Sequence, residues 1–205
     1  MSTASERLPY GEGREALISA VMRIVAAKGL RGVTYRGVAA EAGVNHNLIS
    51  HHFGSIETLL NATMKRAVER AIENTELVLF ADLDERYADA LITSVSAEPE
   101  VHLFQFEMLM EARRHPELRE SLRRLYDNYV ASVQDGLRRR GIEADDDLCS
   151  AVFAALDGLM LQFLTIGEPA SIRAAVVRVG QLLASAIDQS SDATGGGVPT
   201  GTDSA

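Results

Sequence analysis

The stretch of sequence that decides the fold runs from Thr34 to Leu60 and reads TYRGVAAEAGVNHNLISHHFGSIETLL. Apolar residues recur at helical spacing in it, which predicts two short helices, over Tyr35–Ala42 and Asn47–His52. Thr34 is a suitable N-cap for the first helix. Gly43 suits the left-handed turn that lets a second helix begin at a steep angle. The stretch therefore predicts a helix-turn-helix.

The second of these helices has an apolar side and a polar side. Val44, Ile49 and Phe53 would hold it against the first helix. Its polar side fits the major groove of DNA, with the residues at its N-terminus against the base edges. We therefore expect contacts with double-stranded operator DNA from the exposed residues of both helices. The predicted contacts are Thr34, Arg36, Asn45, His46, Asn47, Leu48, Ser50, His51 and His52.

Some of these residues have an alternative role. Arg36 is expected to contact a phosphate, although it could also be an ordinary exposed charge. Capping of the second helix is favoured for Asn45, and contact with a base or sugar edge for Asn47. The histidines raise the question of a metal site. His46 and His51 are five residues apart and do not share a helical face well, so we expect neither a metal nor a cofactor.

The same residues resemble the TetR family of bacterial transcriptional regulators. The first helix of that family is followed by T-x-R-x-[IV]-A-x-x-A-G-V-[SN], and its recognition helix ends in [YH]-[HY]-F-x-[SN]-[KR]-[ED]-x-L. The match runs without gaps from about Arg14 to Leu60, and Glu111–Leu118 (EARRHPEL) and Ala155–Gly158 (ALDG) also look like family features. The resemblance implies an all-α fold, with an N-terminal three-helix helix-turn-helix DNA-binding domain and a C-terminal helical ligand-binding and dimerisation domain.

The resemblance also implies a function, that of a homodimeric repressor released from its operator by a small molecule. Two residues depart from the family pattern. Ser50 stands where a tyrosine is usual and Ile56 where a lysine or arginine is usual, and both usual residues reach DNA phosphates. Their loss implies a weaker grip on DNA without affecting the fold. The alternative function is a helical ligand-sensing or scaffold protein whose DNA-binding head is weakened or lost.

The remainder of the chain predicts further helices and four regions. Pro99, Pro116 and Pro169 each fit the first turn of a helix, and Gly141 and Gly167 fit helix ends. The further helices are expected near Gly13–Ala27, from Ser55, and near Asp84–Ala97, Glu100–Arg114, Pro116–Arg140, Asp145–Thr165 and Pro169–Gln189. The predicted regions are a flexible N-terminus (1–12), the DNA-binding domain (13–54), the ligand-binding and dimerisation domain (55–189) and a disordered tail (190–205).

The helix near Glu100–Arg114 is apolar almost all round, which predicts a central buried helix. Its aromatic and methionine side chains could line a cavity for an unidentified, largely apolar effector, although any one of them is more often core than pocket. For Glu107 and Glu111, ion pairs with arginines are favoured over a ligand contact. The candidate pocket residues are Phe104, Glu107, Met108, Tyr126, Tyr129, Met160 and Phe163.

The last two helices are rich in apolar and small residues. Two such helices at the end of a small chain are best buried against their own copies in a symmetric four-helix bundle. This predicts a homodimer. The expected interface residues are Ala151, Ala155, Gly158, Gln162, Ile172, Val176, Val179 and Leu183.

Composition bounds the remaining possibilities. The 205 residues carry a net charge of −9, yet residues 1–53 carry +2, so a mildly basic head precedes an acidic body. Cys149 is the only cysteine, which excludes an intrachain disulfide and favours a reducing cytoplasm. We expect no signal peptide and no membrane span, because no apolar run approaches about 20 residues. No catalytic triad or paired-carboxylate arrangement rises above chance spacing, so we do not expect an enzyme.

Overall fold

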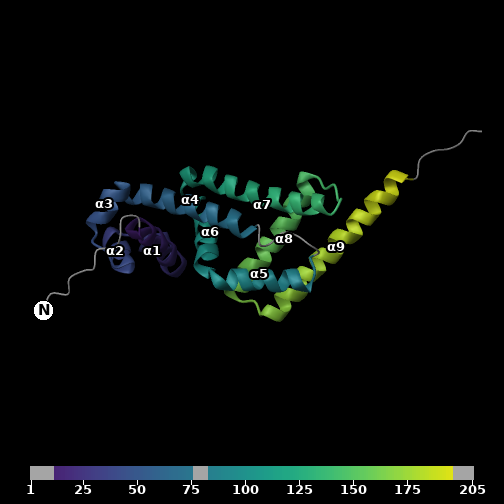
Figure 1. The fold of residues 1–205 in the computed structure, drawn as a ribbon, viewed down its shortest axis with the longest axis horizontal. Helices are drawn as coiled ribbons and strands as arrows, with labels where there is room; N and C mark the ends of the chain where they lie inside the picture. The colour runs from purple at the N-terminus through teal and green to yellow at the C-terminus, as the bar shows by residue number, and fades with distance from the viewer. Residues whose placement is uncertain (1–11, 76–82, 196–205) are drawn as a thin grey trace, which may run out of the picture. The chain divides into compact units, whose positions relative to one another are not determined.

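A computed structural model describes residues 12–75 and 83–195. These residues form nine α-helices and two short 3-10 helices, with no strand among them, which confirms the all-α prediction. The elements in chain order are α1 (Glu12–Lys28), η1 (Leu30–Gly32), α2 (Tyr35–Ala42), α3 (Asn47–Phe53), α4 (Ile56–Thr75), α5 (Glu85–Ala97), α6 (Pro99–Glu111), η2 (Pro116–Leu118), α7 (Arg119–Arg139), α8 (Asp146–Thr165) and α9 (Pro169–Gly195) (Figure 1).

The chain divides into two compact units, each described by itself. Among the described residues, the first unit comprises 12–75 and 93–132, and the second comprises 83–92 and 133–195. The units do not divide at residue 54, where we expected the DNA-binding domain to end, because α4 and α6 share one core with α1. The predicted flexible N-terminus lies almost wholly outside the described residues.

The core of the first unit is built around α1. Leu17, Val21 and Val25 of this helix are fully buried. They belong to one contiguous cluster with Phe104 and Met108 of α6, and α2, α3 and α4 add further apolar side chains to it. Burial of a side chain of this size stabilises the fold by about 1.5–3 kcal/mol. The helix-turn-helix therefore shares its core with α6.

Several helix ends differ from the predicted ones. Pro99 occupies the first turn of α6 as expected, but α6 ends at Glu111, three residues before the predicted Arg114. Pro116 starts a separate 3-10 turn, and α7 begins only at Arg119. At the other end of the chain, α9 continues to Gly195, beyond the predicted end at Gln189. Serine, aspartate and threonine are only mildly unfavourable in helices, so they allow the helix to continue past Gln189.

The core of the second unit includes a hairpin of α8 and α9. Asp145 caps α8, because its side chain accepts a hydrogen bond from the Leu148 N–H at 2.8 Å. At the turn between the helices, the Gly167 N–H donates to the carbonyl of Gln162 at 2.6 Å. A Cβ atom at Gly167 would lie 3.0 Å from that carbonyl oxygen, so the turn favours glycine.

By length and composition alone, α8 could cross a membrane. Our expectation that no segment reaches this length and apolarity is therefore wrong. A single helix of this kind is weak evidence for a membrane protein, because core helices of soluble proteins meet the same criteria. The apolar composition of α8 therefore raises the question of what covers its exposed side.

Candidate functional site

The turn between α2 and α3 sets the direction of α3. Gly43 has a φ of 67°, the left-handed conformation that glycine adopts without strain. The Val44 N–H donates to the carbonyl of Ala39 at 2.9 Å, and the Gly43 N–H donates to the carbonyl of Ala40 at 3.2 Å. This pair of bonds is a Schellman motif, which closes α2 and directs the chain into the second helix. The turn predicted at Gly43 is confirmed.

Side-chain caps fix the start of each short helix. The Thr34 hydroxyl accepts a hydrogen bond from the Gly37 N–H at 3.0 Å, which confirms Thr34 as the N-cap of α2. The side-chain Oδ1 atom of Asn45 accepts a hydrogen bond from the Asn47 N–H at 2.9 Å, which confirms the capping role favoured for Asn45. Ile49 and Phe53 are buried against α1 and α2 as predicted. The short helix α3 is thus held by both packing and capping.

The open side of the two helices is polar. Seven of the nine predicted DNA contacts are exposed, and none of the seven is acidic. Asparagine, serine and histidine donate and accept hydrogen bonds at base edges, and arginine pairs with phosphate. The exposed residues are Thr34, Arg36, Asn45, His46, Asn47, Ser50 and His51.

Leu48 and His52 are placed differently from the others. Leu48 is half-buried and packs against the core, and a Cβ atom at Gly13 would lie only 2.8 Å from its Cδ2 atom. The outward orientation predicted for Leu48 is therefore wrong, because the missing side chain of Gly13 leaves room for it. His52 is also half-buried, with its ring edge-on to Phe53 at 6.2 Å between centroids.

The structure adds two candidates that we did not predict. The guanidinium of Arg14 lies 5.3 Å from the centroid of the Phe53 ring, which places a cation of α1 beside the last residue of α3. Tyr35 is an exposed aromatic residue next to Arg36. The sequence signal for Tyr35 was its place beside the N-cap, whereas nothing local in the sequence links Arg14 to α3.

The two departures from the family pattern have different surroundings. Ile56 is half-buried and packs against the core of the first unit, so it contributes to packing. Ser50 is exposed. The start of α4 is also capped, because the Ser55 hydroxyl accepts from the Thr58 N–H at 3.2 Å. Hydrogen bonds from its own backbone and from Ser55 lower the pKa of the Glu57 carboxyl group.

Two predicted pocket residues are core residues. Phe104 and Met108 are completely buried in the cluster that contains α1, because the most apolar side of α6 packs against α1. Their assignment to a ligand pocket stays a prediction. Glu107 is half-buried beside the end of α1, since its Oε2 atom would lie 3.7 Å from a Cβ atom at Gly29.

The other predicted pocket residues lie in more polar or more open surroundings. In the first unit, the rings of Tyr126 and Tyr129 meet edge to face at 6.5 Å between centroids. The Tyr129 hydroxyl donates to the side-chain oxygen of Gln105 at 3.1 Å, and Gln105 is one of two buried polar residues recorded among the described residues. In the second unit, Met160 is buried and Phe163 is half-buried.

The predicted dimer residues of α8 lie on its open side. Ala151, Ala155 and Gln162 are exposed and Gly158 is half-buried, with open space where a Cβ atom would be. Leu161 on the same helix is 42% exposed. These residues follow helical spacing, so this side of α8 presents small and apolar groups, together with the amide of Gln162, to solvent.

The predicted dimer residues of α9 lie mostly inside their own chain. Ile172, Val176 and Leu183 are buried, and Val179 is half-buried. This apolar stripe is covered within the second unit, where α9 packs against α8, and the assignment of these residues to an interface between copies stays a prediction. Leu182, on the open side of α9, is instead 63% exposed, and Ile166 in the turn between the helices is 85% exposed.

A capped helix-turn-helix with a polar open side, followed by a helical body, defines a helix-turn-helix DNA-binding regulator. Comparison with known proteins agrees. Residues 17–63 match the bacterial regulatory proteins of the tetR family, and residues 81–182 match the tetracyclin repressor-like C-terminal domain. The chain belongs to the TetR family of transcriptional regulators.

Individual relatives and structures support this assignment. The HTH-type transcriptional regulator BetI of Rhizobium meliloti (strain 1021) is 30% identical over 174 residues, covering 80% of this chain and 83% of BetI. A transcriptional regulator from Rhodococcus sp. Rha1 has a TM-score of 0.72 at 20% identity, covering 85% of this chain and 97% of that one, which shows the fold alone. The multidrug binding protein EbrR, complexed with imidazole, has a TM-score of 0.57 at 27% identity, covering 81% of this chain and 93% of EbrR.

Proposed function

We propose that the protein is a cytoplasmic, homodimeric repressor, which binds a near-palindromic operator and is released from it by a small-molecule effector. The observation that carries this proposal is the contrast between two exposed surfaces. None of the seven exposed residues predicted to contact DNA is acidic, and the exposed carboxylate of α2, Glu41, pairs with Arg23 at 2.7 Å, whereas the open side of α8 is mostly small and apolar. A polar surface suits DNA, and an apolar one suits a second copy of the chain.

Within the DNA-binding head, we assign different roles to different residues. Arg36 contacts a phosphate, and Asn47 reads a base edge from the first turn of α3. Asn45 acts mainly as a cap, because its side chain is already bonded to the Asn47 N–H. Leu48 takes no part in the contact, because it packs against Gly13.

Residues 55–189 then serve dimerisation and effector binding. The small residues of α8 form the centre of the dimer interface, with Leu161 beside them. The effector site uses Tyr126 and Tyr129, which combine ring surface with a hydroxyl group. The multidrug binding protein EbrR, whose structures contain imidazole or proflavin, supports an effector with an aromatic part. A hundredfold loss of operator affinity requires the effector to favour the released state by about 2.7 kcal/mol.

The test starts from a pool of random-sequence duplexes, from which the protein selects its own binding site. We expect one near-palindromic sequence to be enriched, and to bind at least a thousandfold more tightly than scrambled DNA at physiological salt. Asn47→Ala should reduce this preference about tenfold or more without changing thermal stability. Asn45→Ala is the matched control, which should lower stability by about 1 kcal/mol through loss of the cap.

One alternative is favoured by a specific observation. Ile56 packs into the core where a phosphate-binding lysine or arginine is usual, so the head could have lost DNA and kept only the sensing body. Failure to enrich any sequence, with no measurable affinity for any duplex, would refute the repressor and favour this alternative. Enrichment of a site that Asn47→Ala binds normally would keep DNA binding and refute the role of Asn47.

A further inference from the structure

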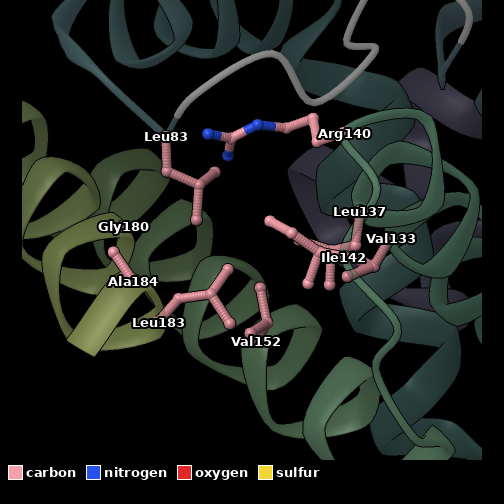
Figure 2. A pocket seen from close by; sticks show the side chains of 9 residues that line it. All are labelled: Leu83, Val133, Leu137, Arg140, Ile142, Val152, Gly180, Leu183 and Ala184. Atoms are coloured by element: carbon pink, nitrogen blue, oxygen red, sulfur yellow. The ribbon is translucent and has the colours of Figure 1, made fainter. Parts of the chain in front are cut away.

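The second unit contains a cavity of about 50 Å³. Figure 2 shows its lining side chains arranged around an open centre. Apart from one glycine and one arginine, all the lining residues are aliphatic. They are Leu83, Val133, Leu137, Arg140, Ile142, Val152, Gly180, Leu183 and Ala184.

One wall of the cavity is produced by the way α7 ends. Gly141 has a φ of 73°. Its N–H donates to the carbonyl of Arg138 at 2.9 Å, and the Ile142 N–H donates to the carbonyl of Leu137 at 3.1 Å. This is a Schellman motif, which folds the residue after the glycine back over the last turn of the helix. Ile142 and Leu137 are thereby brought to the same wall, and Arg140 is left at the end of the helix.

The other lining residues come from α8, from α9 and from Leu83, two residues before the start of α5. A Cβ atom at Gly180 would lie 2.5 Å from the backbone oxygen of Leu83, so only glycine allows this close approach. Leu183 and Val152 are buried and complete the aliphatic lining. Both parts of the lining therefore depend on backbone features that keep aliphatic groups around a small space.

Arg140 gives the cavity its chemical character. Its side chain extends across one side of the open centre in Figure 2. Arg140 also has an interaction within the chain, but a guanidinium has five N–H donors and can bind a carboxylate as well. The neighbouring Arg139 adds positive charge to the same turn. An aliphatic cavity beside an arginine matches a ligand with an alkyl chain and one negative charge.

We propose that this cavity binds a short-chain aliphatic carboxylate. One water-sized group requires about 10–15 Å³ of cavity, so the space of about 50 Å³ accommodates roughly three to five such groups. A methylene is of similar size. The alkyl chain of a carboxylate with about four to six carbons therefore fills the cavity, while its carboxylate pairs with Arg140. This site shares no residue with the DNA-binding side of α2 and α3.

The test is a calorimetric titration of the full chain with pentanoate, alongside acetate, butanoate and heptanoate. Affinity should increase about fourfold for each added methylene, and then stop increasing when the cavity is full. Pentan-1-ol and pentylamine, which lack the negative charge, should bind at least tenfold more weakly. Affinity that rises without limit along the series, or equal binding of the alcohol, would overturn the proposal.

Three variants locate the site. Arg140→Gln should weaken pentanoate binding at least tenfold, because it removes a charged hydrogen-bond donor. Arg139→Gln is the control, since Arg139 is in the same turn but does not line the cavity. Val152→Ala enlarges the cavity, so the preferred chain should become about one carbon longer. Equal losses for both arginine variants, or an unchanged chain-length preference in Val152→Ala, would show that pentanoate does not bind there.

Discussion

The two compact units expose opposite kinds of surface. In the first, the open side of α3 carries asparagine, histidine and serine, while its apolar residues are buried against α1 and α2. In the second, the open side of α8 carries alanine, glycine and leucine. Both helices are amphipathic in the sense that one side is buried in the chain. They differ in what the other side offers to a partner.

This difference bears on what each unit requires in order to function. A polar surface is stable in water and needs no partner until DNA is present. An apolar surface of connected small and large residues is costly to expose and generally marks a site of association. We therefore expect changes in the second unit to affect assembly and stability, and changes in the first to affect DNA affinity.

The largest effect is expected from Gly158→Glu. Open space surrounds the missing side chain of Gly158, so the single chain should tolerate the glutamate. An uncompensated charge at a helix–helix contact is strongly unfavourable, so the dimer should dissociate. Loss of the second half-site contact should then reduce operator affinity by about 10²–10⁴. Sedimentation velocity and anisotropy measure the two effects, and an intact dimer would show that α8 is not the interface.

Two glycines of the second unit, Gly180 and Gly158, should respond in opposite ways to replacement by alanine. Gly180→Ala should lower the free energy of unfolding by about 1–3 kcal/mol, because the new Cβ atom meets the Leu83 backbone oxygen. Gly158→Ala should raise it by about 0.5–1 kcal/mol, since alanine is the better helix former and nothing lies in its way. Urea denaturation of both variants in the same oligomeric state checks this. Equal changes in the two would mean that the close approach at Gly180 is not required.

The sequence predicted the turns of the first unit better than the partners of the apolar helices in the second. Helix ends in the first unit depend on local signals, and Thr34, Gly43 and Asn45 each carry their signal within four residues of the turn that they form. The partner of an apolar stripe is not local. Periodicity identified Ile172 and Val176 as one side of α9, but it could not show whether α8 or a second copy covers that side.

The same limitation explains the pocket residues and Leu48. Phe104 and Met108 were correctly recognised as part of a buried helix, but α1, which lies far away in sequence, covers them. In a helix as short as α3, the spacing of apolar residues in the sequence does not distinguish a half-buried position from an exposed one. Only the contact with Gly13 distinguishes Leu48 from its polar neighbours.

A moderate effect is expected from Arg36→Ala in the first unit. A phosphate contact positions the protein without reading sequence, so affinity for operator and for random DNA should fall by similar factors. The slope of log affinity against log salt should become shallower by about one. Competition assays at two salt concentrations measure both quantities. A change confined to operator DNA would assign Arg36 to base recognition.

The smallest effect concerns pH and His102 of α6, in the first unit. Burial lowers the pKa of its imidazole below the usual 6.5, and the nearby carboxylate of Glu98 only partly offsets this. Glu98 itself lies 3.8 Å from the guanidinium of Arg70. Because the folded state binds the proton less well than the unfolded state, His102 contributes no penalty above about pH 6.5. Stability should then decrease as pH falls from 6.5 toward the lower pKa of the folded state.

Urea denaturation at pH 7.5 and pH 5.5 isolates this contribution, provided that a variant removes the titrating group without removing the side chain. His102→Gln should lose less stability between the two pH values than the natural protein, because glutamine has no proton to gain. His46→Gln is the control, since it makes the same substitution at a histidine that is exposed at the start of α3. If His102→Gln and the natural protein show the same decrease, the acid sensitivity originates elsewhere. If His46→Gln alone flattens the profile, the acid sensitivity belongs to the exposed side of α3, and the buried core of the first unit is not its source.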